Sequence, residues 1–357
     1  MRLLSLVFSL ALTTTLSAAG ATPEGVGFKE IRIHSEARNK DLAVFVWYPA
    51  VAGGEAVPVG EDRIFEGTPA FADAPVAGGD HPIILLSHGS GATVQKMAWI
   101  ATALADAGFV VAGPNHPGTT SGDSTPEDTP KLWERTDDLS TVLSALLAEP
   151  KFRSVIDPDK IGALGFSLGG AAVLQLAGAR ARLDDYVRYC DTYPDMPDCR
   201  WFAGGRAYVD QTEVQVEAYD LRNVDQARFE QSNLDTRLQT VVAVDPALAT
   251  AFDLESLEEV RSALHFVNLG AHETVPIAVR SDTLASSISH GSLTNIENAV
   301  HFSFLPVCRQ GAKAFMKAIG EADPLCSDEG SRSRAALHEE LEQTIVDLFR
   351  SSFSKVK

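Results

Sequence analysis

Serine, histidine and carboxylate side chains together can build a nucleophilic centre, and one serine of this chain stands in a setting suited to that chemistry. The segment Gly165-Phe-Ser-Leu-Gly-Gly170 follows an apolar run that predicts a strand and precedes an apolar run that predicts a helix. Such a strand–turn–helix setting strains the turn, exposes the seryl hydroxyl and directs the helix N-terminus toward it. We therefore predict that Ser167 is a nucleophile; the alternative is a glycine-rich helix start with a capping serine.

An earlier loop, Ser87-His-Gly-Ser-Gly91, directly follows the apolar run 83–86. A serine hydrolase needs two N–H donors aimed at the oxygen that becomes negative during attack. One should be the amide of Leu168, next to the nucleophile, and the second should come from this loop, where Ser90 is our candidate. His88 precedes the serine, so we expect it to hold the loop by hydrogen bonds rather than to act as a base.

The base is expected after Ser167, with the acid between the two, because this is the chain order that such a turn favours. His301 follows the last predicted strand, in the segment Ala-Val-His-Phe-Ser-Phe, and is the candidate base. The other histidines after the serine are weaker candidates, since they fall inside a predicted strand, on the closing helix, or in loops and helix ends: His265, His338, His272 and His290.

Two carboxylates remain open as the acid that orients the base. Asp245 ends the predicted strand 240–244, and Glu273 follows the next predicted strand. Both come after the carboxyl ends of strands, where α/β folds place their active groups. We prefer Asp245, with Glu273 as the alternative.

These groups require an α/β framework to position them. Strands are predicted at 27–34, 42–48, 82–87, 109–112, 160–166, 240–244, 264–268 and 293–298, and helices at 94–107, 130–148, 168–181, 253–262, 280–288 and 334–354. This alternation predicts a mostly parallel central sheet with helices on both faces, and the first two strands are expected at its edge as an antiparallel pair.

Three segments interrupt the alternation. Residues 51–80, rich in Gly, Pro and Ala, predict a loop, and the polar, charge-rich residues 182–238 predict a lid-like insertion over the active site. The segment Asn115–Gly118 follows a strand; it could line the pocket, but we favour the interpretation that it only shapes a turn.

The first 21 residues have the features of a secretory signal peptide. A basic start is followed by a mostly apolar run and then by small residues, with cleavage expected after Ala19 or Ala21. The apolar run is short for a membrane span, which needs roughly 20 residues, so a retained anchor is only a minor alternative. We expect a hydrolase domain at 22–357, secreted or periplasmic, with no stable membrane anchor.

Cysteine and charge content refine this picture. In an oxidising compartment the four cysteines favour two local disulfides, Cys190–Cys199 and Cys308–Cys326, from three possible pairings. Their spacing matches no zinc motif, and we expect neither a metal nor a cofactor. The formal net charge of −18 argues against nucleic acid as a partner. A small-molecule or lipid-like ester is the expected substrate.

Taken together, the motifs Ser-His-Gly-Ser-Gly, Gly-Phe-Ser-Leu-Gly-Gly, Val-Asp-Pro-Ala-Leu and His-Phe-Ser-Phe carry a family resemblance. From about residue 27 to its end, the chain resembles bacterial proteins called predicted dienelactone hydrolases, which are related to the platelet-activating factor acetylhydrolases. The resemblance implies the α/β-hydrolase fold.

The resemblance also implies site residues. The acid, base and first oxyanion amide of the acetylhydrolases correspond to Asp245, His301 and Ser90 of this chain, whereas other members of the bacterial group place the acid near Glu273. Dienelactone hydrolases proper use a cysteine nucleophile, so dienelactone is not carried over as the substrate of a chain with Ser167.

The sequence thus predicts a secreted serine esterase that works through an acyl-enzyme on Ser167. Two alternatives remain. One is a binding protein built on a catalytically inactive hydrolase fold, and the other is an acyltransferase that uses the same triad.

Overall fold

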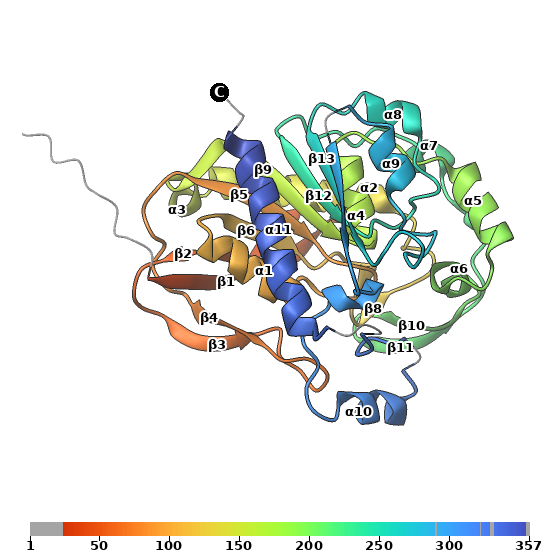
Figure 1. Ribbon diagram of the computed structural model, residues 1–357, viewed down its shortest axis with the longest axis horizontal. Helices are drawn as coiled ribbons and strands as arrows, with labels where there is room; N and C mark the ends of the chain where they lie inside the picture. The colour runs from red at the N-terminus through yellow and green to blue at the C-terminus, as the bar shows by residue number, and fades with distance from the viewer. Residues whose placement is uncertain (1–23, 290, 322, 329–331, 355–357) are drawn as a thin grey trace, which may run out of the picture.

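A ten-stranded sheet forms the centre of the molecule (Figure 1). The computed structural model describes residues 24–354, except 290, 322 and 329–331. Within this part of the chain the strand order is β14-β13-β12-β9-β5-β6-β2-β1-β4-β3. The six consecutive parallel strands are β14 (Gly291–Ile296), β13 (Ala263–Leu269), β12 (Thr240–Val244), β9 (Ile156–Phe166), β5 (His81–Ser87) and β6 (Val110–Pro114). The predicted mostly parallel sheet is therefore confirmed.

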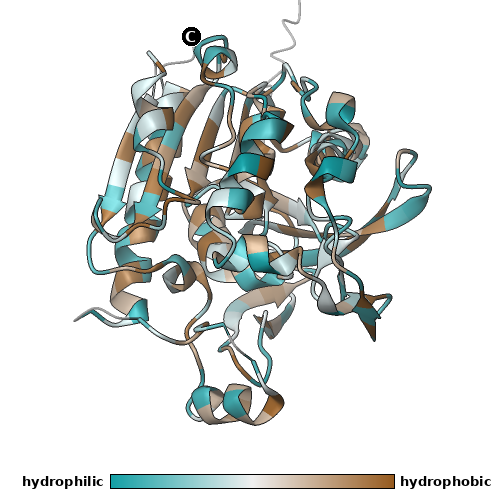
Figure 2. Cartoon of the chain, turned by 90° about the vertical axis from the view of Figure 1, so that its right-hand side faces the viewer, coloured by the Kyte–Doolittle hydropathy of each residue, from teal (hydrophilic) through white to brown (hydrophobic). Residues whose placement is uncertain are grey.

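Helices cover both faces of the sheet, as predicted. Helices α2 (Leu132–Ala148) and α4 (Leu168–Leu176) pack on one face, and α1 (Ala98–Asp106) and α11 (Arg334–Ser354) pack on the other. In β5, alternate side chains join opposite cores, with Leu85 facing α2 and α4 and Leu86 facing α1 and α11. Figure 2 shows hydrophobic stretches along the central strands and hydrophilic residues concentrated on the outer helices and loops.

The edge beyond β6 differs from the prediction. Strands β1 (Gly25–Ser35) and β2 (Lys40–Ala50) pair antiparallel as expected, but they lie inside the sheet. Strand β4 (Thr68–Ala72) pairs with β1, and β3 (Glu55–Val59) pairs with β4 and forms the edge; both lie within residues 51–80, where a loop was predicted. Both strands are short and each contains a proline, which cannot donate an N–H to a neighbouring strand. Such strands lack the long apolar run by which the other strands are recognised.

Helix α4 is shorter than the predicted 168–181. It ends at Leu176 because Gly178 adopts a left-handed φ of 104° and donates its N–H to the carbonyl of Gln175. The segment 182–238 therefore begins shortly after the end of α4.

Residues 182–238 lie between α4 and β12 and contain several small elements. Strands β10 and β11 form a second, four-stranded sheet together with two short strands from residues 119–124. The strand order in this sheet is β11-β10-β8-β7. The elements are α5 (Leu183–Thr192), α6 (Pro197–Trp201), β10 (Gly205–Val209), β11 (Thr212–Val216), η2 (Leu221–Asn223) and α7 (Gln226–Phe229), with β7 (Thr119–Thr120) and β8 (Asp123–Ser124).

The remaining elements are short and lie mainly in connections. They are η1 (Val94–Met97), α3 (Pro150–Arg153), α8 (Leu254–Glu258), α9 (Asp282–Ser286), η3 (His301–Phe304) and α10 (Ala312–Ile319). Helix α10 stands apart from the rest of the molecule at the bottom of Figure 1.

Two disulfides fasten these peripheral segments. Cys190–Cys199 joins α5 to α6, and Cys308–Cys326 closes the loop that contains α10, so both predicted pairings are confirmed. None of the helices in the described part of the chain has the length and hydropathy needed to cross a membrane. The predicted signal peptide, residues 1–21, lies outside the described residues.

Candidate active site

The predicted site residues come together at one edge of the sheet. Ser167 directly follows β9, Asp245 directly follows β12, and the loop that contains Ser90 directly follows β5. His301 comes after β14 and begins η3. Because these four strands are parallel, their carboxyl ends share one edge, which is where open α/β sheets bind ligands.

Ser167 stands on a strained turn. Its φ of 54° and ψ of −120° are unusual for a residue with a Cβ atom, and its N–H donates to the carbonyl of Val244, 3.0 Å away. At Gly169 a Cβ atom would lie 1.9 Å from the carbonyl oxygen of Ser87, so only glycine fits. Leu168 is the first residue of α4, and its N–H consequently has no acceptor within the helix.

A hydrogen-bonded chain links the predicted nucleophile, base and acid. The Oγ of Ser167 lies 3.2 Å from Nε2 of His301, and Nδ1 of His301 lies 2.9 Å from Oδ2 of Asp245. A carboxylate can only accept, so Nδ1 carries the proton, and Nε2 is left to accept from the seryl hydroxyl. The His301 side chain is 23% exposed, whereas that of Asp245 is fully buried. The arrangement can therefore remove a proton from Ser167.

The buried Asp245 carboxylate is held by a residue that the sequence reasoning did not single out. Its Oδ1 accepts hydrogen bonds of 2.9 Å from Nδ2 of Asn268 and from the backbone N–H of Leu269. The amide of Asn268 also binds Val279 and Ser281, which fixes its orientation. These bonds direct Oδ2 toward His301. A polar asparagine inside the apolar run of β13 was the one available signal for this role.

Aromatic and carbonyl contacts hold η3, the turn that contains His301. The ring of Phe166 lies 4.8 Å from the imidazole of His301 and 4.8 Å from the ring of Phe304. The indole N–H of Trp99 donates to the carbonyl of Phe304. His338 of α11 stacks on Trp99 and bonds the carbonyl of Ser303, so this predicted rival supports the turn instead of reaching Ser167.

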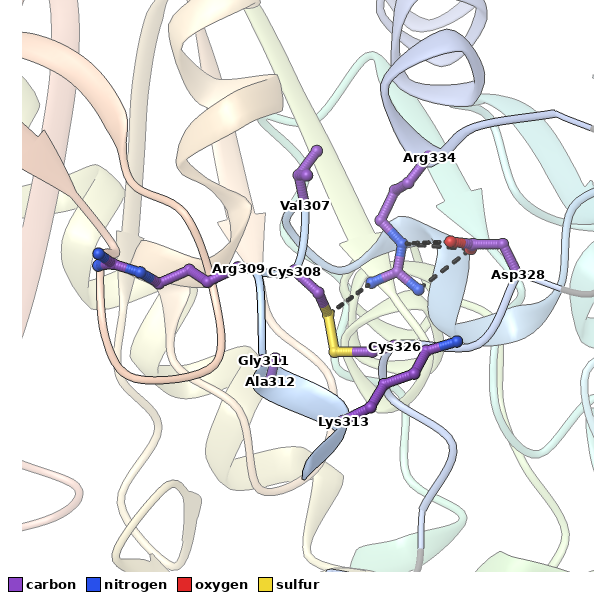
Figure 3. A pocket seen from close by; sticks show the side chains of 9 residues that line it. All are labelled: Val307, Cys308, Arg309, Gly311, Ala312, Lys313, Cys326, Asp328 and Arg334. Carbon is purple, nitrogen blue, oxygen red and sulfur yellow. Dashed lines mark hydrogen bonds and ion pairs between the residues drawn. A yellow bond between two sulfur atoms is a disulfide. The ribbon is translucent and has the colours of Figure 1, made fainter. Parts of the chain in front are cut away.

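Polar contacts complete the support of η3. The hydroxyl of Ser303 accepts from the N–H of Val300 and donates to Asp328. Arg334 binds Asp328 and points toward the Cys308–Cys326 disulfide, as Figure 3 shows. Asp328, Arg334 and the disulfide help to line a hollow of about 350 Å³, whose lining includes none of the three candidate catalytic residues. The hollow is thus separate from the candidate site.

The loop with Ser90 is packed against Ser167. A Cβ atom at Gly89 would lie 3.5 Å from the Cβ of Ser167. His88 is fully buried, accepts at Nε2 from the N–H of His116, and donates from Nδ1 to the carbonyl of Gly89, 2.7 Å away. In a trans peptide the carbonyl of Gly89 and the N–H of Ser90 point in opposite directions, so this bond fixes the N–H of Ser90 as well. His88 holds the loop in this way.

A second Ser–His–Asp array lies beneath this loop. Ser87 Oγ is 3.0 Å from Nε2 of His116, and Nδ1 of His116 is 2.9 Å from Oδ2 of Asp138. All three residues have an exposed fraction of 0%, which leaves no path for a substrate. Burial and the charges of Arg135 and Arg38 lower the pKa of His116 well below its ordinary value. His116 is therefore a neutral, buried link, and it does not line an accessible pocket.

The remaining predicted candidates lie elsewhere. Glu273 is exposed, and in the described part of the chain no hydrogen bond or ion pair joins it to His301. His272 bonds Asp282 on the surface, and His265 bonds Ser292 and Ser352. His290 lies outside the described residues. Among the described residues no group of three His, Cys, Asp or Glu side chains is placed to hold a metal ion.

Comparisons with known proteins identify the family and the fold of the chain. A family model described as "Alpha/beta hydrolase family" matches residues 83–307. No curated protein matches the chain at a significant level. Among solved structures, a ferulic acid esterase from Streptomyces cinnamoneus is similar with a TM-score of 0.59 at 16% identity, covering 94% of this chain and 92% of that one.

Two further solved structures are similar at a lower score. A dienelactone hydrolase from Anabaena variabilis has a TM-score of 0.47 at 14% identity, with 93% of this chain and 99% of that chain covered. A predicted CIB-like hydrolase from Thermoplasma acidophilum has a TM-score of 0.45 at 16% identity, with 92% and 100% covered.

The contact at Gly169 gives a first test of the site geometry. In Gly169→Ala the new methyl group collides with the Ser87 carbonyl, so helix α4 must move away from β5. Because a misplacement of about 1 Å can cost 10²-fold in rate, we expect labelling of Ser167 by a fluorophosphonate to slow by about 10²-fold.

Gly108→Ala is the matched control, since Gly108 has a φ of 103° in a turn with open space around its missing Cβ. It should lower the melting temperature without slowing the labelling of Ser167. Equal labelling rates in Gly169→Ala and the native protein would contradict the geometric role of Gly169.

Proposed function

We propose that this chain, which belongs to the alpha/beta hydrolase family, is a serine esterase. It would be secreted and would cleave carboxylic esters through an acyl-enzyme on Ser167. The observation that carries the proposal is the continuous pair of hydrogen bonds from Ser167 through His301 to Asp245, 3.2 Å and 2.9 Å long. The half-buried serine at this junction is reachable by a substrate, unlike Ser87 in the buried array.

In the proposed reaction, Nε2 of His301 takes the hydroxyl proton as Ser167 attacks the ester carbonyl carbon. The carbonyl oxygen becomes negative and accepts from the N–H groups of Leu168 and Ser90. His301 then gives the proton to the leaving alcohol oxygen, and the acyl group remains on Ser167. A water molecule repeats the sequence and releases the carboxylic acid. Asp245 stabilises the imidazolium form of His301 in both steps.

Residues 182–238 act as a lid in this proposal. Burial raises the pKa of Asp198 in α6, and the charge of His301 acts in the opposite direction, so α6 lies within electrostatic range of His301. Tyr189 of α5 donates to Asp198, and the disulfide Cys190–Cys199 ties the two helices together. The loop closed by Cys308–Cys326 also approaches, because His301 and Arg200 both act on Asp323. In this proposal the lid and this loop flank the approach to Ser167.

The carboxyl groups within electrostatic range of His301 favour a neutral ester. Asp198 and Asp323 would repel a carboxylate or phosphate group carried by a substrate. This supports the small-molecule or lipid-like ester expected from the sequence. The chemistry requires no cofactor or metal.

Hydrolysis of p-nitrophenyl acetate, butyrate and octanoate tests the proposal directly. We expect turnover by the native protein and a loss of about 10⁶-fold in kcat for Ser167→Ala, since the acyl-enzyme cannot form. The order of the three rates indicates which acyl-chain length the pocket accommodates. Absence of turnover, together with no fluorophosphonate label on Ser167, would leave a binding protein; ester formation with added alcohol instead of hydrolysis would indicate an acyltransferase.

Asp245→Asn and Glu273→Gln form a matched pair that distinguishes the two candidate acids. Asparagine at 245 cannot hold the proton on Nδ1 of His301, so we expect kcat to fall by about 10⁴-fold. The exposed Glu273 should tolerate glutamine with full activity. A large loss in Glu273→Gln, with Asp245→Asn active, would transfer the role to Glu273.

Export is tested by expressing the full chain in a Gram-negative bacterium. The two disulfides and the lack of a spanning helix among the described residues are compatible with an oxidising compartment outside the cytoplasm. We expect a periplasmic or secreted protein that begins at Gly20 or Thr22, measured by intact mass and N-terminal sequencing. A chain that keeps residues 1–19 and stays with the cytoplasm would argue against the signal peptide.

A further inference from the structure

Arg135 of α2 is a buried cation without a carboxylate of its own. Its exposed fraction is 1%, and within the described residues no ion pair with an aspartate or glutamate reaches it. The nearest acid on its helix, Asp138, is occupied by Arg38, which binds both carboxylate oxygens, and by His116. Burying a charge is costly unless hydrogen bonds and nearby opposite charge compensate it. The position of Arg135 therefore calls for an explanation.

The guanidinium of Arg135 donates to uncharged oxygen atoms of two segments: residues 87–88, which precede Ser90, and Thr119, which contacts Gly91. Its Nη1 donates to the carbonyl of His88 at 2.7 Å and to the hydroxyl of Ser87 at 3.2 Å. Its Nε donates to the hydroxyl of Thr119 at 3.0 Å. The carbonyl of Thr119 in turn accepts from the N–H of Gly91, 2.9 Å away. Arg135 thus secures the residues on either side of Gly89 and Ser90.

We propose that Arg135 is a positioning residue for the oxyanion hole. By binding this loop, Arg135 fixes the direction of the Ser90 N–H and places a positive charge on the side of the loop opposite the substrate. The inference rests on the proposed function and goes beyond the residues that contact the substrate. The charge matters because negative charge develops on the substrate oxygen just across the loop. In a buried setting of low dielectric constant, such an interaction is stronger than it would be in water.

The hydrogen bonds around Arg135 have a single consistent direction. Ser87 accepts from Arg135, so its own hydroxyl proton goes to Nε2 of His116, and His116 donates from Nδ1 to Asp138. Asp138 is fixed by Arg38 near the surface. The second Ser–His–Asp array is thereby explained as a brace that prevents the guanidinium from rotating. Burial lowers the pKa of Arg135 to about 9, which leaves it charged at neutral pH.

A purely structural arginine and a positioning arginine differ in kinetics. Loss of a core contact lowers stability, whereas loss of oxyanion stabilisation lowers kcat and weakens transition-state analogues more than ground-state ligands. The informative variants are Arg135→Met, which removes the charge but keeps a long side chain, and Arg135→Lys, which keeps the charge but loses the forked hydrogen bonds. Asp137→Asn is the matched control, because Asp137 lies on the same helix α2 but is exposed and outside this hydrogen-bonded network.

The experiment measures kcat and KM with a p-nitrophenyl ester, the Ki of a boronic acid that forms a tetrahedral adduct with Ser167, and the melting temperature. For Arg135→Met we expect kcat to fall by about 10²-fold with KM nearly unchanged, and the boronic acid to weaken by a similar factor. Arg135→Lys should recover part of both. Asp137→Asn should match the native protein in kcat and Ki.

Should Arg135→Met fail to fold, Thr119→Val provides the second measurement. It keeps the guanidinium but removes the acceptor of Nε, and we expect a loss of about 10-fold in kcat with KM unchanged. If Arg135→Met folds and keeps the native kcat and Ki, the inference about Arg135 is wrong. The same holds if Thr119→Val and Arg135→Lys both keep the native values; in either case the proposed function would still stand. A native protein without Ser167-dependent turnover would instead overturn the proposed function and this inference with it.

Discussion

Helix α4 begins so close to the end of β5 that Gly169 leaves no space for a Cβ atom beside the carbonyl of Ser87. This backbone contact brings together the turn that contains Ser167 and the loop that contains Ser90. The distance between the seryl hydroxyl and the two proposed oxyanion donors is therefore set by main-chain packing, which does not relax with side-chain rotation. A rigid framework of this kind is what electrostatic preorganisation requires.

Burial separates two arrays that have the same residue types. In Ser167–His301–Asp245 the histidine is 23% exposed and the serine can meet a substrate. In Ser87–His116–Asp138 all three residues are fully buried, and the serine hydroxyl is already bound by Arg135. A buried donor or acceptor left without a partner costs about 1–3 kcal/mol, so the buried array persists only as a fully bonded unit. The same types of side chain thus form the proposed reaction centre in one place and a fully buried, bonded unit in the other.

The sequence predicted the parts of the fold that depend on local pattern. Strand–helix alternation, the turn around Ser167 and the two disulfide pairings follow from short segments, and each agrees with the structure. Strands β3 and β4 were missed because both are short, contain proline and lack an apolar run. Asn268 and Arg135 were missed for a different reason. Their importance lies in contacts between segments distant in the chain, with Asp245 and with His88, which no local pattern records.

The charges around the candidate site match the charge separation of the proposed reaction. As Ser167 attacks, negative charge grows on the substrate oxygen and positive charge on the imidazole of His301. Arg135 binds the carbonyl of His88 in the loop that contains Ser90, the proposed oxyanion donor. Asp245 bonds the imidazole directly, while Asp198 and Asp323 lie within its electrostatic range. Because these groups are fixed before the substrate binds, the field they produce needs no rearrangement during the reaction. In the proposed mechanism a substrate at Ser167 therefore meets a site already polarised for attack on its carbonyl carbon.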